Sequence, residues 1–143
     1  MNNENTAPEA KSASLGIVIG LWTAQVLIFL FFGIVGAMKL FMPVEKLAAM
    51  WVWPGQYPLW FLYGLGVIDI AGGVGVLLPA LTKIKPGLTV VAAWCGIALQ
   101  ICATVFHFSR GEADHTPANF VAIGLLFFII WGRTKVAPIR ASV

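Results

Sequence analysis

Charged residues are scarce in this sequence: they occupy 10% of its 143 positions, whereas hydrophobic residues occupy 59%. Soluble domains carry roughly 25% charged residues, so this deficit excludes an ordinary water-soluble domain. The nine basic residues flank apolar segments and form no cluster, which argues against nucleic-acid binding despite the net charge of +3. The composition instead predicts a membrane protein.

Cysteine and histidine are also scarce, with two of each. Cys95 and Cys102 are seven residues apart in one apolar segment, about 10 Å along a helix, which is too far for a disulfide. We expect both to be small buried packing residues, because free cysteine is usually buried. Only His107 lies in an apolar segment, which excludes a bis-histidine haem, and no His, Cys, Asp or Glu cluster has metal-ligand spacing. The sequence therefore predicts no metal site.

Four apolar segments are long enough to cross a bilayer as helices, since about 20 residues span its hydrocarbon core. We predict these spans at residues 15–41, 58–79, 87–109 and 117–132. The segment between the first two spans contains Trp51, Trp53 and Tyr57 and is predicted to form a short interfacial helix, because aromatic rings concentrate at membrane interfaces. We interpret it as an aromatic anchor, with a lid over the bundle as the alternative. The predicted fold class is all-α, an integral membrane four-helix bundle with this short interfacial segment.

The membrane domain is predicted over residues 15–133, between a disordered N-terminal tail at residues 1–14 and a basic C-terminal tail at residues 134–143. An even number of spans places both tails and the loop at residues 82–86 on one side. That side carries six basic residues, Arg133 among them, and the opposite side carries three. By the positive-inside rule, both termini are expected in the cytoplasm.

Asp69 is the least expected residue of the chain, because it lies at the middle of the second apolar segment. A carboxylate at that depth costs about 2.5–3.5 kcal/mol on insertion scales, so it should face protein or water and have a partner. Lys39 reaches Asp69 only if the helices tilt or a helix end shifts by one turn; otherwise water or His107 must bridge them. We therefore predict a polar pocket floored by Asp69 and open to the non-cytoplasmic side.

The candidate pocket residues all fall near the outer helix ends or at the pocket floor. They are Lys39, Asp69, His107, Arg110, Glu112 and Asn119. Structural roles are the alternative for several of them. Lys39 would extend to the interface, His107 would interact with a helix C-terminus, and Asn119 would cap a helix. No catalytic residue is assigned.

Four motifs occur together along the chain: GAMKLF with Lys39, GVIDIAGGVGVLLPAL with Asp69, HFSRGE and PANF. In combination they resemble the DoxX-like family of small bacterial four-helix membrane proteins, over roughly residues 29–133. Many members have glutamate where this chain has Asp69. The resemblance implies a four-helix bundle in the bacterial cytoplasmic (inner) membrane and a link to quinone-dependent sulfur or thiol redox systems.

Three functions are consistent with these residues. The first is a redox-associated, quinone-linked membrane subunit, in which Lys39, Asp69 and His107 hold the head group of a quinone or similar amphiphile and relay protons. The second is a non-catalytic scaffold or assembly factor whose polar cluster fixes helix register. The third is a membrane isomerase or cyclase that uses Asp69 as general acid on an apolar substrate, which requires a cavity beside Asp69.

The cofactor and partner predictions follow from these hypotheses. No cofactor is certain, and a bound quinone or lipid is the candidate. The candidate partners are membrane lipids, proteins of a redox complex and a second copy of the chain, with no nucleic acid.

Overall fold

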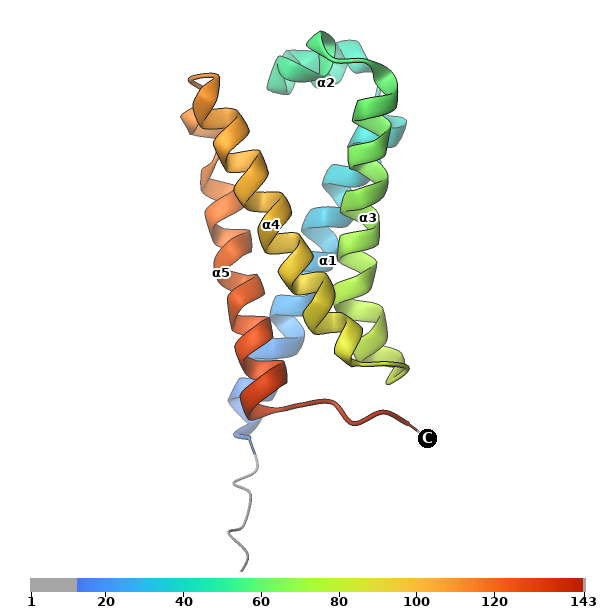
Figure 1. Cartoon of the computed structure of the whole chain (residues 1–143), viewed down its shortest axis with the longest axis vertical. Helices are drawn as coiled ribbons and strands as arrows, with labels where there is room; N and C mark the ends of the chain where they lie inside the picture. The colour runs from blue at the N-terminus through green and yellow to red at the C-terminus, as the bar shows by residue number, and fades with distance from the viewer. Residues whose placement is uncertain (1–12, 143) are drawn as a thin grey trace, which may run out of the picture.

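The computed structural model describes residues 13–142, which fold into a bundle of four long helices (Figure 1). The elements in chain order are α1 (Leu15–Phe41), α2 (Val44–Trp51), the 3-10 turn η1 (Trp53–Gln56), α3 (Leu59–Thr82), α4 (Gly87–Ser109), the 3-10 turn η2 (Ala113–His115), α5 (Pro117–Trp131) and the π-helical turn η3 (Gly132–Val136). The predicted all-α helical bundle is confirmed. Most of the predicted N-terminal tail, residues 1–12, lies outside the described residues.

Four helical segments are long and apolar enough to cross a membrane. Their lengths of 27, 24, 23 and 24 residues correspond to roughly 35–40 Å at about 1.5 Å per residue, which exceeds a hydrocarbon core of ~30 Å. The fourth segment is longer than predicted and covers Ala113–Val136, because η2 and η3 extend α5 at its two ends. Length and composition together define a multi-pass membrane protein.

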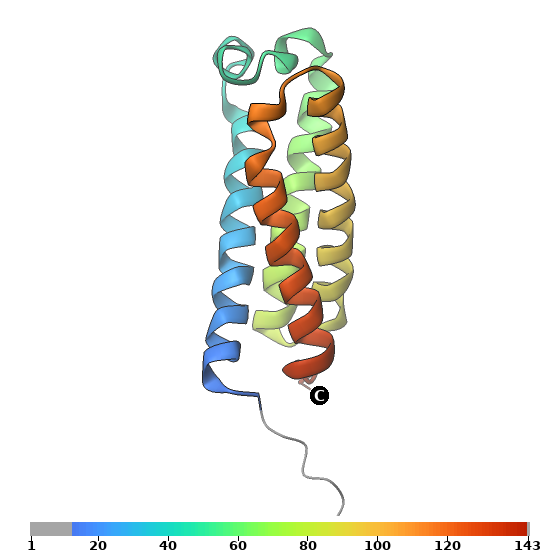
Figure 2. The same ribbon diagram turned by 90° about the vertical axis from the view of Figure 1, so that its left-hand side faces the viewer.

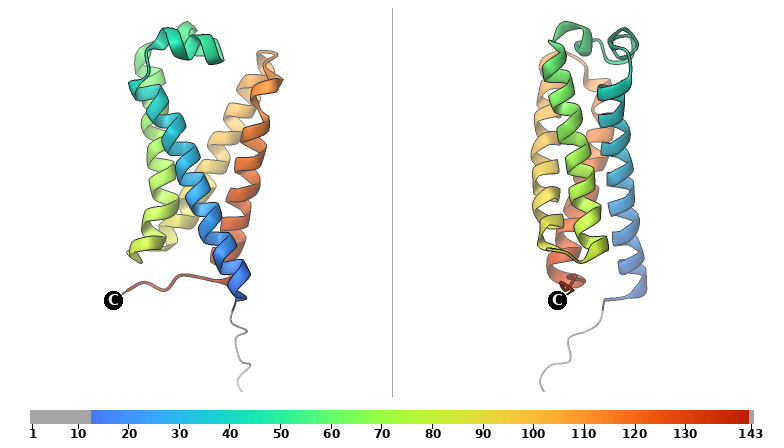
Figure 3. Two further views of the ribbon diagram at one scale, coloured as in Figure 1. Left: turned by 180° about the vertical axis from the view of Figure 1, so that it is seen from behind. Right: turned by 90° about the vertical axis from the view of Figure 1, so that its right-hand side faces the viewer.

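The four long helices form two pairs that diverge toward one end of the bundle (Figures 1 and 3). In one pair α1 packs along α3, and in the other α4 packs along α5. We call the end that carries α2 the capped end. The opposite end, where the C-terminus lies, is the terminal end (Figure 1). The centre of the hydrophobic core consists of Ile28, Phe32, Val76, Ile97 and Leu126, all at most 4% exposed.

The short helix predicted between the first two spans is confirmed, and it lies across the capped end together with η1 (Figure 2). Leu47 of α2 and Trp53 of η1 are buried against Leu62 of α3. Val52, between α2 and η1, has a positive φ of 55°, which β-branched residues rarely adopt. The burial of Leu47 and Trp53 on either side of Val52 in the chain offsets this local strain.

The prediction that Cys95 and Cys102 are buried is wrong, because both are free and exposed on α4. The buried face of α4 is formed instead by small and polar residues, including Ala93, Gly96 and Gln100. In a membrane protein the outer surface meets lipid chains that are as apolar as the protein core. An apolar segment therefore does not reveal by hydrophobicity which of its faces is buried.

Candidate functional site

A cavity of about 350 Å³ lies near the capped end, lined by residues of all four long helices. The two helix pairs diverge toward this end (Figure 1). The walls of the cavity are mainly aromatic and aliphatic side chains from α1, α3 and α4, and Trp51 and Trp53 contribute from the segment across the capped end. The polar side chains that line it are Lys39, Asp69, Gln100, His107, His115 and Asn119. The cavity is therefore an apolar chamber with a small number of polar groups.

Lys39 of α1 and Asp69 of α3 form a direct ion pair in the wall of this cavity. The Nζ atom of Lys39 donates a hydrogen bond to Oδ2 of Asp69 at 2.5 Å. Their side chains are 11% and 5% exposed. The two charged groups are in direct contact, so no bridge through His107 or water is needed to join them.

Two glycines bring the helices close enough for this pair to form. Gly36 and Gly66 each lie three residues before a charged residue of the pair and share its helix face. A Cβ atom on Gly36 would lie 2.7 Å from the carbonyl oxygen of Gly66 and 3.1 Å from Cβ of Asp69. Such an approach is available only to glycine, and it explains why the short aspartate side chain reaches Lys39.

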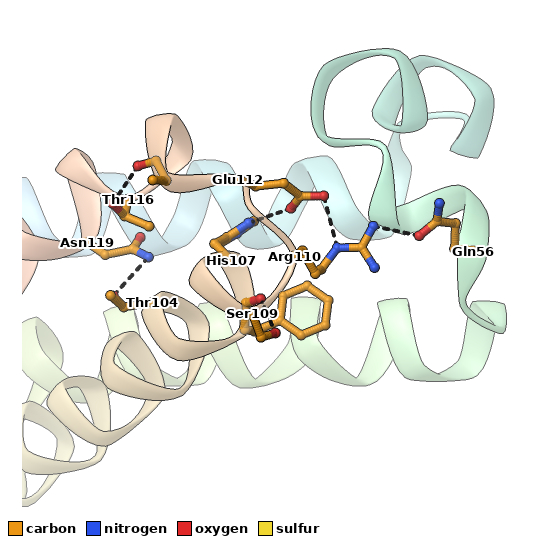
Figure 4. Close-up of polar contacts among 10 residues, drawn as sticks. Gln56, Thr104, His107, Ser109, Arg110, Glu112, Thr116 and Asn119 are labelled. Carbon is orange, nitrogen blue, oxygen red and sulfur yellow. Dashed lines mark hydrogen bonds and ion pairs between the residues drawn. The ribbon is translucent and has the colours of Figure 1, made fainter.

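His107 belongs to a chain of hydrogen bonds that runs from the cavity to the segment across the capped end (Figure 4). Its Nδ1 atom lies 2.9 Å from Oε2 of Glu112, and Nε of Arg110 donates to Oε1 of the same carboxylate at 2.9 Å. The Nη2 atom of Arg110 donates to Oε1 of Gln56 in η1 at 2.6 Å. The chain thus fixes the His107 ring and connects it to η1.

Glu112 is held as a carboxylate by this arrangement. Partial burial raises its pKa, but the hydrogen bonds and positive charges of His107 and Arg110 outweigh that effect and leave the pKa of Glu112 below its ordinary value of 4.5. A carboxylate that binds Nδ1 of His107 leaves the second ring nitrogen, Nε2, for other partners. Such an imidazole can accept or deliver a proton at Nε2.

Asn119 and Thr104 connect α5 to α4 beside the cavity (Figure 4). The Nδ2 atom of Asn119 donates to Oγ1 of Thr104 at 3.3 Å, and this hydroxyl donates to the carbonyl oxygen of Gln100 at 2.7 Å. Asn119 is thus bound to the neighbouring helix and does not cap its own. One N–H and the side-chain oxygen of Asn119 are left without a partner among these contacts.

The predicted site residues fall into two groups. Lys39, Asp69, His107 and Asn119 line the cavity, whereas Arg110 and Glu112 lie behind His107 and hold it in place. Gln56 is not among the predicted residues, because a lone glutamine in a turn has no distinctive sequence pattern. Among residues 13–142, no three His, Cys, Asp or Glu side chains are grouped as metal ligands.

A second buried polar cluster lies toward the terminal end. Arg133 is 7% exposed, and its Nε and Nη2 atoms donate to Oε1 of Gln25 at 2.9 and 2.5 Å. Gln25 in turn donates to the carbonyl oxygen of Val76 at 2.7 Å, and the Arg133 guanidinium lies 4.7 Å from the ring centre of Trp22. The sequence placed Arg133 among exposed topology signals; the helical turn η3 folds it back into the bundle instead.

The fold and the cavity define a small multi-pass membrane protein of the four-helix-bundle class, with an ion pair in an apolar chamber. A model of the DoxX-like family matches residues 23–130, about three quarters of the sequence. The chain therefore belongs to the DoxX-like family, as the motifs predicted. No curated protein matches the chain, and no solved structure matches it.

Proposed function

We propose that the chain is a redox-associated membrane subunit that binds the head group of a quinone in the cavity near its capped end. The observation that carries this proposal is the ion pair of Lys39 and Asp69 in the wall of an apolar cavity that His107 also lines. Ionisable side chains within a membrane-spanning bundle are costly and mark functional sites by default. A ligand with polar groups at its head and an apolar body matches such a chamber.

The polar residues of the cavity fit a head group that carries carbonyl oxygens. An ammonium has three donors, and Lys39 uses one of them on Asp69. His107 uses Nδ1 on Glu112, and Asn119 uses one N–H on Thr104. Each side chain therefore retains hydrogen-bonding capacity for a ligand. The volume of about 350 Å³ falls within the range of roughly 300–1,000 Å³ for ligand pockets.

A bound quinone would supply the exchange of electrons together with protons. The chain's own residues bind and orient the head group, and the aromatic walls exclude water from it. His107 moves a proton at Nε2 while Glu112 holds Nδ1. In this proposal the electrons pass to or from a partner protein of a membrane redox complex.

The orientation of the chain in the bacterial inner membrane is part of the proposal. The basic residues Lys83, Lys85, Lys135 and Arg140 are exposed at or near the terminal end. The capped end carries fewer basic residues outside the cavity, namely Lys46 in α2 and Arg110 after α4. The positive-inside rule then places the terminal end in the cytoplasm and the cavity toward the opposite side.

The test is to measure the quinone that co-purifies with the protein in mild detergent, by solvent extraction and chromatography. Wild type should retain quinone, and Asp69→Ala should lose it. Asp114→Ala is the matched control, because Asp114 is exposed and does not line the cavity. The proposal is wrong if wild type retains no quinone from membranes that contain it, or if both variants retain the same amount.

The scaffold hypothesis makes a different prediction for the same residues. If the ion pair of Lys39 and Asp69 only fixes the register of α1 on α3, the double variant Lys39→Met with Asp69→Leu should still bind its protein partners. The isomerase or cyclase hypothesis requires a cavity beside Asp69, and the described cavity meets that requirement. Turnover of an apolar substrate without quinone retention would favour it over the proposed function.

A further inference from the structure

Cys102 on α4 indicates where the cavity opens to the outside of the bundle. It lines the cavity, and it is exposed beside Ile101 and Val105 of α4, which are exposed without lining the cavity. Cys95, two turns earlier on the same helix, is also exposed but does not line the cavity. A residue that both lines a cavity and is exposed lies at its rim. The cavity therefore reaches the outer surface of the bundle beside Cys102.

This opening lies at the depth of the lipid chains. Cys102 is seven residues before the end of α4 at Ser109, which is about 10 Å along the helix axis. The 23 residues of α4 extend roughly 35 Å, close to the ~30 Å of a hydrocarbon core. Cys102 is therefore inside the apolar layer, where the surface of the bundle meets acyl chains.

The opening lies between α3 and α4. These helices are joined by a short turn near the terminal end and diverge toward the capped end (Figure 1). Their side chains beside the cavity are apolar and only half-buried, namely Phe61 and Leu65 on α3 and Leu99 and Phe106 on α4. The ion pair of Lys39 on α1 and Asp69 on α3 lines the same cavity.

The geometry points to a lateral portal through which a lipid-borne amphiphile enters the cavity from the bilayer. The head group reaches the polar side chains, and the tail remains between α3 and α4 with its end in the lipid. This inference rests on the proposed function for the identity of the head group. It narrows the ligand class to molecules with a long apolar tail, since a water-soluble ligand would gain nothing from an opening at this depth.

The first test compares two quinones in lipid nanodiscs, one with a long isoprenoid tail and one without a tail. Cys102→Trp should fill the portal and cause loss of the long-tailed quinone, whereas binding of the tail-less quinone should persist. Cys95→Trp is the matched control and should bind both as wild type does. Unchanged binding of the long-tailed quinone by Cys102→Trp would overturn the portal and leave the proposed function intact. Absence of binding of both quinones by wild type would instead overturn the proposed function.

The second test needs no ligand. A nitroxide is attached to Cys102 in a Cys95→Ser background, and its relaxation by oxygen and by a water-soluble nickel complex is measured in nanodiscs. The portal requires strong relaxation by oxygen and weak relaxation by nickel, because oxygen partitions into lipid. Strong relaxation by nickel would show that this side of the cavity opens to water and would overturn the inference.

Discussion

Both ends of the bundle bury a cation, but they surround it differently. Near the capped end, Lys39 is paired with the carboxylate of Asp69 and lies beside a cavity. Toward the terminal end, Arg133 is surrounded by neutral groups, chiefly the amide of Gln25 and the ring of Trp22. A guanidinium spreads its charge over a flat group that stacks and makes several hydrogen bonds, whereas an ammonium is a compact charge. The buried cation at the terminal end therefore serves helix packing, whereas the side chains of the cavity at the capped end keep hydrogen-bonding groups free for a ligand.

The largest loss of stability should follow when the partner of the buried cation is removed, Asp69 near the capped end or Gln25 toward the terminal end. Asp69→Leu leaves the Lys39 ammonium without its counter-charge and should lower the free energy of unfolding by about 3–5 kcal/mol. Gln25→Leu should lower it by about 1–3 kcal/mol, because the ring of Trp22 still contacts Arg133. Thermal unfolding in detergent measures both. Greater destabilisation by Gln25→Leu than by Asp69→Leu would contradict this difference between the two ends. Adding Lys39→Met to Asp69→Leu should restore stability, because it removes the unpaired ammonium.

A smaller effect should follow from a methyl group placed between α1 and α3. In Gly36→Ala the new Cβ atom meets the backbone oxygen of Gly66, which cannot move aside, so the helices must separate. Overpacking of this kind lowers stability by about 1–3 kcal/mol. Gly33→Ala is the control, because nothing lies within 4 Å of its Cβ position, and it should gain up to about 1 kcal/mol of helix propensity. Equal stability of the two variants would contradict the close approach at Gly36.

The smallest effect concerns pH. Because the folded-state pKa of Glu112 lies below 4.5, its carboxylate stabilises the folded state above that pH, and this contribution is lost as the pH falls through the lowered value. The stability difference between wild type and Glu112→Gln should therefore shrink on acidification from about pH 6 to pH 3. Other acidic groups are common to both proteins and cancel. A difference that stays constant over this range would contradict the prediction.

Much of the site was predictable, because a charged residue inside an apolar segment stands out in the sequence. An aspartate in the middle of an apolar segment needs a partner, and Lys39 is the cation within reach on the preceding helix. The direct contact was not predictable, because it depends on how closely α1 approaches α3 at Gly36. The bond from Arg110 to Gln56 joins residues 54 positions apart that no sequence pattern relates.

The membrane environment, the number of spanning helices and the short helix across the capped end could all be inferred from the amino-acid sequence. These features follow from the length and polarity of local segments, because a bilayer accepts only apolar helices long enough to span it. The buried helix faces, the position of Arg133 and the cavity beside Asp69 become evident only once the helices are packed together. Lipid and protein interior are similarly apolar, so hydrophobicity does not distinguish them, and packing between helices makes that choice.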